Sequence, residues 1–278
     1  MRQVENFFER DAQLVNIREE MLEVIGEQLK RHEHVMGYFY GGAIGAHQTD
    51  QYSDIDLRVI VQPAFYEAFV NEKKEIAKSF GDLLFCEETQ DRASYITLHY
   101  RNFIKVDLFI YRPQDLCPSI WNKKIEISYD PYGMVEHIHS ASKSFMYDLN
   151  EREINHWRTK FFATYHDLYR SVNRKESFKA MHDLNELRWL MATGWMMEQG
   201  VLPNNYLEWS NIEGERSSLS QAQVDQLKKW DLTSDLEHII TTAKGIKDEF
   251  VKLHHTLCRK ASVVENKEWV HQVLNQVA

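Results

Sequence analysis

The stretch of residues 38–61 constrains the fold of this chain more than any other part of its sequence. An apolar run ends at Gly41 and Gly42, a polar loop follows, and Asp54 and Asp56 stand at the head of a second apolar run. This pattern predicts a strand, a glycine turn and a strand that carries carboxylates. Side chains two residues apart on a strand lie on the same face. We therefore expect Asp54 and Asp56 to lie side by side.

Two carboxylates this close repel each other, so their arrangement becomes favourable when divalent cations neutralise it. Oxygen ligands suit a hard ion such as magnesium. Glycine at positions 41 and 42 lets backbone N–H groups approach a phosphate closely. A phosphate-binding turn beside magnesium carboxylates indicates a nucleoside triphosphate. The alternative is that these are ordinary turn residues, because a D-x-D pattern alone is weak evidence.

A third carboxylate interrupts the apolar run FIKVDLFIY at residues 103–111. Asp107 is expected on the same strand face as Lys105 and Phe109. A charged residue in the middle of a strand is costly unless it is paired or bound to a cation. Asp107 is therefore a candidate third metal ligand, and the alternative is an ion pair with Lys105 or Arg58.

The composition excludes some classes of partner. The 278 residues carry a formal net charge of −9, so the surface should repel a nucleic-acid backbone. The widely spaced Cys86, Cys117 and Cys258 are expected to be free thiols in a reducing compartment. No apolar run approaches the length that spans a membrane. We expect a soluble, cytoplasmic protein that binds neither nucleic acid nor membrane.

The sequence predicts two domains of different class, residues 1–145 and 146–278. In the first, a helical pattern over residues 3–32 precedes the glycine turn, and a second helix follows Pro63. Strands are also expected at 83–88, 95–101, 103–111 and 125–129, before the turn sequence DPYG. These elements predict an α/β (α+β) domain, a mixed sheet with helices on one face and the carboxylates on the other.

The second domain is predicted to be a helical bundle. Its sequence is almost free of strand patterns, and helices are expected near 177–198, 218–230, 232–260 and 265–277. Four aromatic residues at intervals of four lie on one face of the preceding helix: Trp157, Phe161, Tyr165 and Tyr169. Core or interdomain packing is favoured over ligand binding for this row.

The combination of GG, a gap of eleven residues, SDID and an apolar strand resembles the signature of the polymerase-beta-like nucleotidyltransferase superfamily. The segments DQYSDIDL, VDLFIY and YDPYGMV, followed by a helical domain, look most like the bacterial aminoglycoside and lincosamide adenylyltransferases. The resemblance covers most of the first domain and only the helical character of the second. Gly42 departs from it, because many members have serine there.

The resemblance implies magnesium-dependent transfer of a nucleoside monophosphate, with ATP as the expected donor, to a hydroxyl of a small acceptor. The acceptor could be an aminoglycoside or lincosamide, which would make the protein an antibiotic-resistance enzyme. Two magnesium ions, roughly 3.5–4 Å apart, would be bound by the catalytic carboxylates Asp54, Asp56 and Asp107. The residues expected at the nucleotide are Gly41, Gly42, Ser53 and Lys105. Three candidates for a general base remain open: Glu87, Glu88 and Glu186.

A candidate acceptor site lies on the predicted helix near residues 177–198. Asp183 and Glu186 share one face, with Trp189 a further turn along, so they could bind a polycation by ion pairs and a cation–π contact. The expected packing stripe is Phe178, Met181, Leu184, Leu187 and Met191. The alternative is a solvated helix face with Trp189 partly buried.

Two other functions remain open from the sequence. A non-catalytic nucleotide-sensing or antitoxin-type module could retain the same fold, although such modules commonly lose a carboxylate. Transfer of the nucleotide to a protein side chain is the second alternative. The acceptor, the preferred base of the nucleotide and the oligomeric state do not follow from the sequence.

Overall fold

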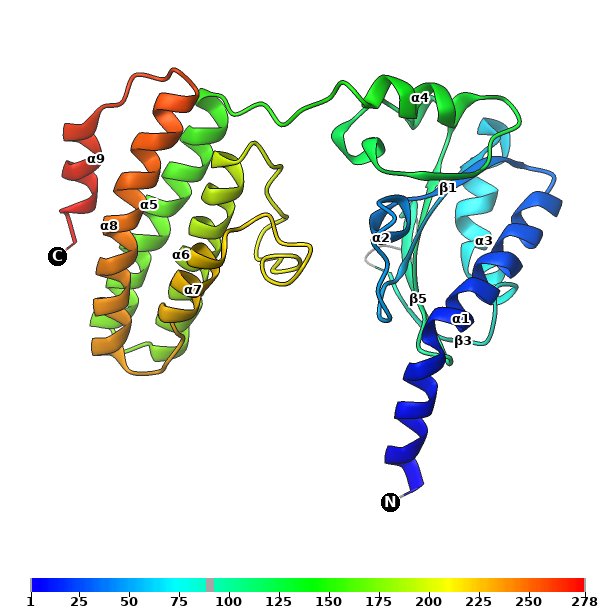
Figure 1. The fold of residues 1–278 in the computed structure, drawn as a ribbon, viewed down its shortest axis with the longest axis horizontal. Coiled ribbons are helices and arrows are strands. Elements are labelled where there is room, and N and C mark those ends of the chain that lie inside the picture. Colours follow the sequence, from blue (N-terminus) through cyan, green and yellow to red (C-terminus); the bar gives the residue numbers. More distant parts are fainter. Residues whose placement is uncertain (1, 89–92, 278) are drawn as a thin grey trace. The chain divides into compact units, whose positions relative to one another are not determined.

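The computed structural model describes residues 2–88 and 93–277, and the chain divides into two compact units, Met1–Phe145 and Met146–Ala278. Unit 1 is a mixed sheet with helices, and unit 2 is helical (Figure 1). The predicted fold class is therefore confirmed. In the described residues, no helix combines the length and the apolar character needed to cross a membrane.

Six strands of unit 1 form one sheet in the order β3-β4-β5-β2-β1-β6. The strands are β1 Val35–Tyr40, β2 Ile55–Val61, β3 Leu83–Glu87, β4 Tyr95–Tyr100, β5 Lys105–Tyr111 and β6 Glu126–Tyr129. The pairing of β2 with β5 is parallel and the other pairings are antiparallel. Because β2 and β5 run in the same direction, their first residues meet at one edge of the sheet.

Two helices, α1 and α3, cover one face of the sheet. Every second residue of β2, from Ile55 to Val61, is buried in the core on that face. The alternate residues Asp56 and Arg58 therefore lie on the opposite face. The helical segments of this unit are α1 Arg2–Arg31, α2 Gly42–Gly45, α3 Tyr66–Lys78 and α4 Met134–Ser142, with short 3-10 turns at Pro63–Phe65, Pro113–Asp115 and Ile120–Lys123.

The helix α4 corrects the prediction that helices cover only one face. The DPYG turn leads directly into α4, because the Asp130 carboxylate accepts the backbone N–H groups of Met134 and Glu136, both at 2.9 Å. Val135 on this helix joins a small core with Phe39 and Ile60 on the carboxylate-bearing face. Sequence periodicity missed α4 because the helix is short.

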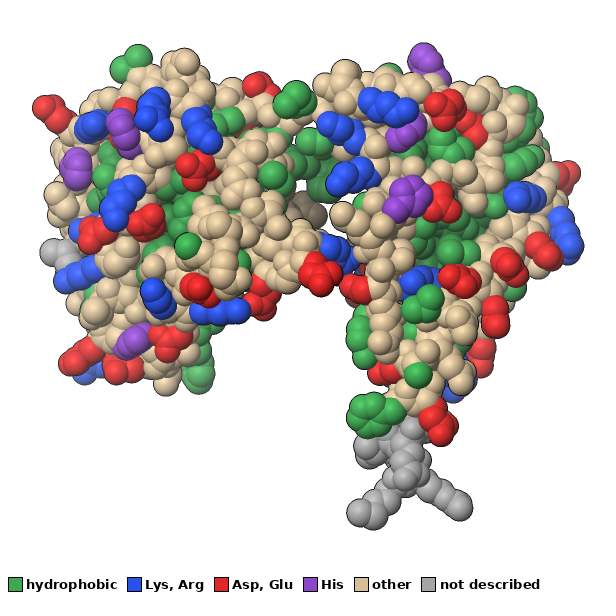
Figure 2. Space-filling view, in the orientation of Figure 1, with side chains coloured by type: hydrophobic (Ala, Val, Ile, Leu, Met, Phe, Trp, Pro, Cys, Tyr) green, Lys and Arg blue, Asp and Glu red, His purple; other side chains and the backbone are tan. Residues whose placement is uncertain are grey.

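Exposed glutamates follow the outward side of α1, where Figure 2 shows acidic side chains along the edge of this unit. Glu19, Glu20, Glu23 and Glu27 are all exposed. This part of the surface would repel a phosphate backbone. The three cysteines are free thiols, as predicted.

Unit 2 is a bundle in which α5, α6 and α8 pack on one another (Figure 1). Its helices are α5 Glu151–Asn173, α6 Ser177–Glu198, α7 Gln221–Lys229, α8 Leu236–Lys260 and α9 Lys267–Leu274. Trp157 and Phe161 stack on Phe250 of α8, with ring centroids 4.8 and 3.8 Å apart. Packing, the favoured role of the aromatic row on α5, is therefore confirmed for these two residues.

The predicted faces of α6 need correction. Phe178, placed in the packing stripe, is 85% exposed, whereas Asp183 and Glu186 are only 1% and 5% exposed. The helix contacts α5, α7 and α8, so almost its whole surface is covered after its first turns. The alternative of a solvated face for Asp183 and Glu186 is therefore wrong. Helical periodicity identifies one packed face and does not reveal a helix that is covered on several sides.

Candidate functional site

The strand register brings the three predicted carboxylates together. Asp56 on β2 stands opposite Asp107 on the parallel strand β5. Asp54 lies two residues before Asp56, at the edge where both strands begin. The sequence predicted one shared face for Asp54 and Asp56, and the parallel pairing adds Asp107 to it.

Lys105 occupies the space between two of these carboxylates. Its ammonium group lies 2.6 Å from Asp54 Oδ2 and 3.0 Å from Asp107 Oδ2. Burial alone would lower the pKa of Lys105, but hydrogen bonds to Asp54 and Asp107 outweigh it and raise that pKa. Lys105 is therefore a cation that offsets part of the carboxylate charge in this structure. This pairing is the alternative that the sequence left open for Asp107.

The Asp107 side chain is also positioned by two hydroxyl groups of β4. Thr97 Oγ1 donates to Asp107 Oδ1 at 2.6 Å, and the Tyr95 hydroxyl donates to the same oxygen at 3.0 Å. Both residues lie on the carboxylate face because Thr97 is the partner of Asp107 across the β4–β5 pair. Neither residue was predicted from the sequence as part of the site, although the alternation of residues 95–100 was a usable signal.

Asp56 carries the least compensated charge of the group. Burial and the nearby Asp54 raise the pKa of Asp56, and Arg58 only partly opposes this effect. The ligand oxygens of Asp54, Asp56 and Asp107 do not all lie within 4.8 Å of one another. Among the described residues, the group of His, Cys, Asp or Glu side chains that meets this distance is His182, Asp183 and Glu186, in unit 2.

The glycine turn lies directly against Asp56. The N–H group of Gly41 donates to the backbone carbonyl of Asp56 at 2.9 Å. Gly42 has a φ of +53°, and a Cβ atom added there would overlap with the carboxylate oxygen of Asp56. A serine side chain at position 42 would therefore require the Asp56 carboxylate or the turn itself to shift.

Arg58 contributes a second cation that the sequence analysis did not assign to the site. Its guanidinium lies 5.2 Å from the ring centroid of Phe109 and 5.9 Å from that of Phe39. Its Nη1 atom is buried, has no hydrogen-bond partner in the described residues, and occupies the space that a Cβ atom on Gly41 would need. Arg58 therefore packs against the glycine turn at Gly41 and offsets part of the carboxylate charge.

Ser53, predicted to contact nucleotide, closes the loop before β2. Its hydroxyl accepts the N–H of Asp50 at 2.8 Å and donates to Asp50 Oδ1 at 2.9 Å. Arg18 donates to the carbonyl groups of Asp50 and Ser53 at 2.8 and 3.2 Å. These bonds position the loop that leads to Asp54, and a nucleotide contact of Ser53 stays a prediction.

The three candidate general bases all have cationic or histidine partners. Glu88 pairs with Lys73 at 2.5 Å and Lys74 at 2.6 Å. Glu87 accepts a hydrogen bond from His99 Nε2 at 2.6 Å, and His99 is the cross-strand neighbour of Lys105. Glu87 is therefore linked to the carboxylate site through one side chain.

The predicted acceptor residues of unit 2 form a buried polar cluster. Asp183 is paired with Lys179 and accepts a hydrogen bond from Ser171 at 2.9 Å. Glu186, the third candidate base, lies 3.0 Å from Lys160 Nζ. Trp189 is buried, and its Nε1 atom has no hydrogen-bond partner in the described residues. A cationic acceptor would have to displace two lysines, so acceptor binding by these residues stays a prediction.

These contacts predict a structural effect for Asp183. Asp183→Asn should lower the free energy of unfolding by about 1–3 kcal/mol, because it leaves the buried Ser171 and the neighbouring Lys179 poorly paired. Denaturant unfolding followed by circular dichroism measures the change. Asp167→Asn is the matched control, because Asp167 pairs with Arg170 at an exposed position and should change stability by less than about 0.5 kcal/mol. Equal stabilities of the two variants would contradict this role.

Comparisons with known proteins give low similarity. No protein-family model and no curated protein matches the sequence. Among solved structures, the chain is similar to an aminoglycoside 6-adenyltransferase from Bacillus subtilis, with 12% identity, a TM-score of 0.42 and coverage of 92% of this chain and 97% of that one. It is also similar to a nucleotidyltransferase-like protein from Exiguobacterium sibiricum, with 12% identity, a TM-score of 0.40 and coverage of 87% and 78%.

Proposed function

We propose that unit 1 transfers a nucleoside monophosphate, AMP from ATP, to a hydroxyl group of a small acceptor and releases pyrophosphate. The observation that carries this proposal is the group of Asp54, Asp56 and Asp107 on one sheet face, in contact with a glycine turn at Gly42. A structural ion pair alone would not require three carboxylates against two cations. The excess negative charge favours binding of a further cation.

Asp54, Asp56 and Asp107 would bind divalent magnesium, and their donor set of carboxylate oxygens fits that ion. When bound, magnesium would neutralise charge that develops on the α-phosphate and on leaving pyrophosphate. Lys105 now occupies the position of a cation between Asp54 and Asp107. The Lys105 ammonium group could also contact a phosphate oxygen of a nucleotide bound beside these carboxylates.

The glycine turn would bind the triphosphate. Gly42 brings the backbone next to Asp56 without a side chain between them, so N–H groups of the turn can approach phosphate oxygens. The Arg58 guanidinium packs against Gly41 and adds positive charge beside the turn. The phosphate and the carboxylates would therefore meet beside the turn.

The transfer itself needs few further groups. The acceptor oxygen would form a bond to the α-phosphorus while the bond from that phosphorus to the bridging oxygen breaks, and pyrophosphate would leave. The acceptor proton would pass to His99, whose other ring nitrogen donates to Glu87. Of the three candidate bases, Glu87 is the one linked by a described hydrogen bond to a neighbour of Lys105.

Incubation with magnesium, α-labelled ATP and a panel of hydroxylated acceptors tests the proposal. The panel includes aminoglycosides, lincosamides and proteins as separate arms. We expect pyrophosphate release and a labelled product that depend on both magnesium and one acceptor class. Nucleotide binding without product would favour the sensing alternative, and labelled protein would favour a protein acceptor. Absence of magnesium–nucleotide binding in a calorimetric titration would contradict the proposal.

A further inference from the structure

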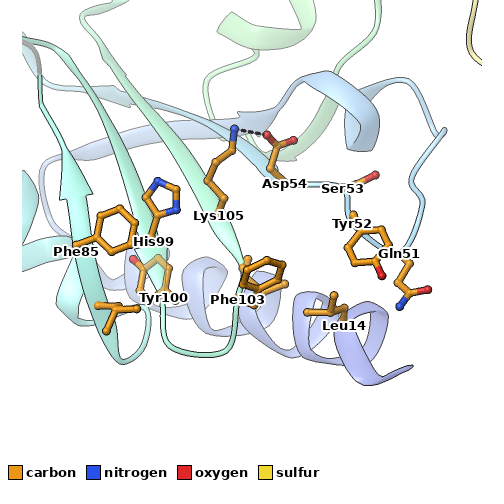
Figure 3. A pocket seen from close by; sticks show the side chains of 12 residues that line it. Leu14, Gln51, Tyr52, Ser53, Asp54, Phe85, His99, Tyr100, Phe103 and Lys105 are labelled. Atoms are coloured by element: carbon orange, nitrogen blue, oxygen red, sulfur yellow. Dashed lines mark ion pairs between the residues drawn. The ribbon is translucent and has the colours of Figure 1, made fainter. Parts of the chain in front are cut away.

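A pocket of about 500 Å³ opens beside Asp54 and Lys105, entirely within unit 1 (Figure 3). Its size is in the range of pockets that bind small organic ligands. It is lined by residues of α1, the loop before β2, β3, β4 and the β4–β5 hairpin. The carboxylate site therefore continues into a defined cavity.

Aromatic side chains make the inner wall of this pocket. Phe85 and His99 stack with ring centroids 4.2 Å apart and an interplanar angle of 11°. The register aligns Phe85, His99 and Lys105 in one row across β3, β4 and β5. Phe85 is 52% exposed, so a face or edge of its ring is available to a ligand. A planar group could lie on this wall by stacking.

The hairpin supplies another aromatic ring at an unusual backbone position. Phe103 has a φ of +72°, a conformation that is strained for a bulky residue. Its side chain is 58% exposed and lines the pocket. Arg10 of α1 lies over the ring at 4.0 Å from its centroid and restrains it. A strained, exposed and restrained ring is more consistent with a binding role than with core packing.

The opposite wall is also positioned before a ligand arrives. Gln51 donates to the carbonyl of Asp11 at 2.7 Å, and the Tyr52 hydroxyl donates to the Asp11 carboxylate at 3.3 Å. These bonds attach the loop before β2 to helix α1. Preorganised walls reduce the ordering cost of binding.

The position of the pocket indicates which of the two substrates could bind there. In the sheet order, β3, β4 and β5 lie on one side of the Asp54 and Asp56 strand, and β1 with its glycine turn lies on the other. A triphosphate at the turn and a ligand in the pocket would therefore reach the carboxylates from opposite sides. An attacking hydroxyl must approach from the side opposite to the leaving pyrophosphate.

The lining offers few charged groups to a polycation. Asp54 and Lys105 are the two formally charged lining side chains among the described residues, and they form an ion pair with each other. A ligand with several ammonium groups would find no further carboxylate in the lining. The pocket suits an uncharged group.

We infer that this pocket binds the acceptor, an uncharged molecule with a planar aromatic group, and directs its hydroxyl toward Asp54 and Asp107. The inference rests on the proposed function, because a bound hydroxyl compound is an acceptor only if the transfer reaction takes place. The expected class of acceptor is therefore a neutral aromatic alcohol and not an aminoglycoside.

The first test measures binding without nucleotide. Saturation-transfer NMR uses 2-naphthalenemethanol as the probe, with cyclohexanemethanol and an aminoglycoside as comparison ligands. We expect the naphthalene compound to bind most tightly, and Phe85→Ala and Phe103→Ala each to weaken it about three- to tenfold. Both residues are half-exposed, so the variants should fold. Phe178→Ala, at a residue 85% exposed in unit 2, is the matched control and should bind like wild type.

The second test measures transfer from magnesium–ATP to the same aromatic alcohol. We expect both pocket variants to raise the KM for the alcohol and leave the KM for ATP unchanged, since one substrate alone loses binding energy. No probe binding, binding unaffected by both variants, or tighter binding of the aminoglycoside would overturn the inference. Probe binding without transfer would overturn the acceptor role. Calorimetric titration with magnesium–ATP then shows separately whether the proposed function also fails.

Discussion

Asp56→Asn should leave unit 1 at least as stable as the wild type while it lowers the rate of nucleotidyl transfer by at least about a hundredfold. The loss follows because stabilisation of transition-state charge by bound metal is worth several kcal/mol, and 1.36 kcal/mol corresponds to a factor of ten in rate. The stability follows from the raised pKa of Asp56, which burial and the charge of Asp54 cause. A carboxyl pKa that is higher in the folded state means that its charge opposes folding near neutral pH. Neutral asparagine removes that cost.

The other two carboxylates should behave differently in stability. Asp54→Asn and Asp107→Asn should lower activity to a similar extent, but each removes an ion pair with Lys105. They should therefore fail to stabilise the unit. Asp82→Asn serves as the control, because Asp82 pairs with Arg101 at an exposed position. Initial rates of pyrophosphate release and thermal unfolding measure the two quantities. Wild-type turnover in all three site variants would exclude these residues from the reaction.

Gly42→Ser should abolish transfer and lower the stability of unit 1. The left-handed backbone at position 42 costs about 1–2 kcal/mol for a residue with a Cβ atom. The added atom would also lie 1.7 Å from Asp56 Oδ2, so one of the two groups must move. Relief of the overlap would displace either the turn or Asp56. Both displacements would separate the proposed phosphate site from the carboxylates.

Gly133→Ser is the matched control for this prediction. Gly133 also has a positive φ, +67°, but a Cβ atom there would meet nothing within 4 Å. It should therefore show the conformational cost alone and retain activity. Denaturant unfolding and the rate of pyrophosphate release are measured for both variants. If Gly42→Ser were as active as Gly133→Ser, the contact between the turn and Asp56 would have no part in the reaction.

Local periodicity in the sequence was sufficient to predict several features of the structure. The alternation in residues 54–61 placed Asp54 and Asp56 on one face, because side-chain direction on a strand follows from the backbone of that strand alone. Spacing of four residues likewise placed Trp157 and Phe161 on one face of α5. The mixed sheet followed by helices was predictable for the same reason, since each pattern is complete within one element.

Only the tertiary structure decided what lies next to each candidate site residue. The ammonium of Lys105 between Asp54 and Asp107, and the hydroxyl groups of Tyr95 and Thr97 at Asp107, depend on strand order and register. These are properties of segments far apart in the sequence. Periodicity within one strand contains no information on its neighbour.

The clearest differences concern burial. Asp183 and Glu186 share a helix face, as their spacing requires, but other helices cover that face, and Lys160 of α5 pairs with Glu186 while Lys179 of α6 itself pairs with Asp183. The preference for glycine at position 42 similarly arises from a positive φ and from the contact with Asp56 of β2. Spacing along the chain determined which side chains share a face, whereas packing between distant segments determined what each face meets.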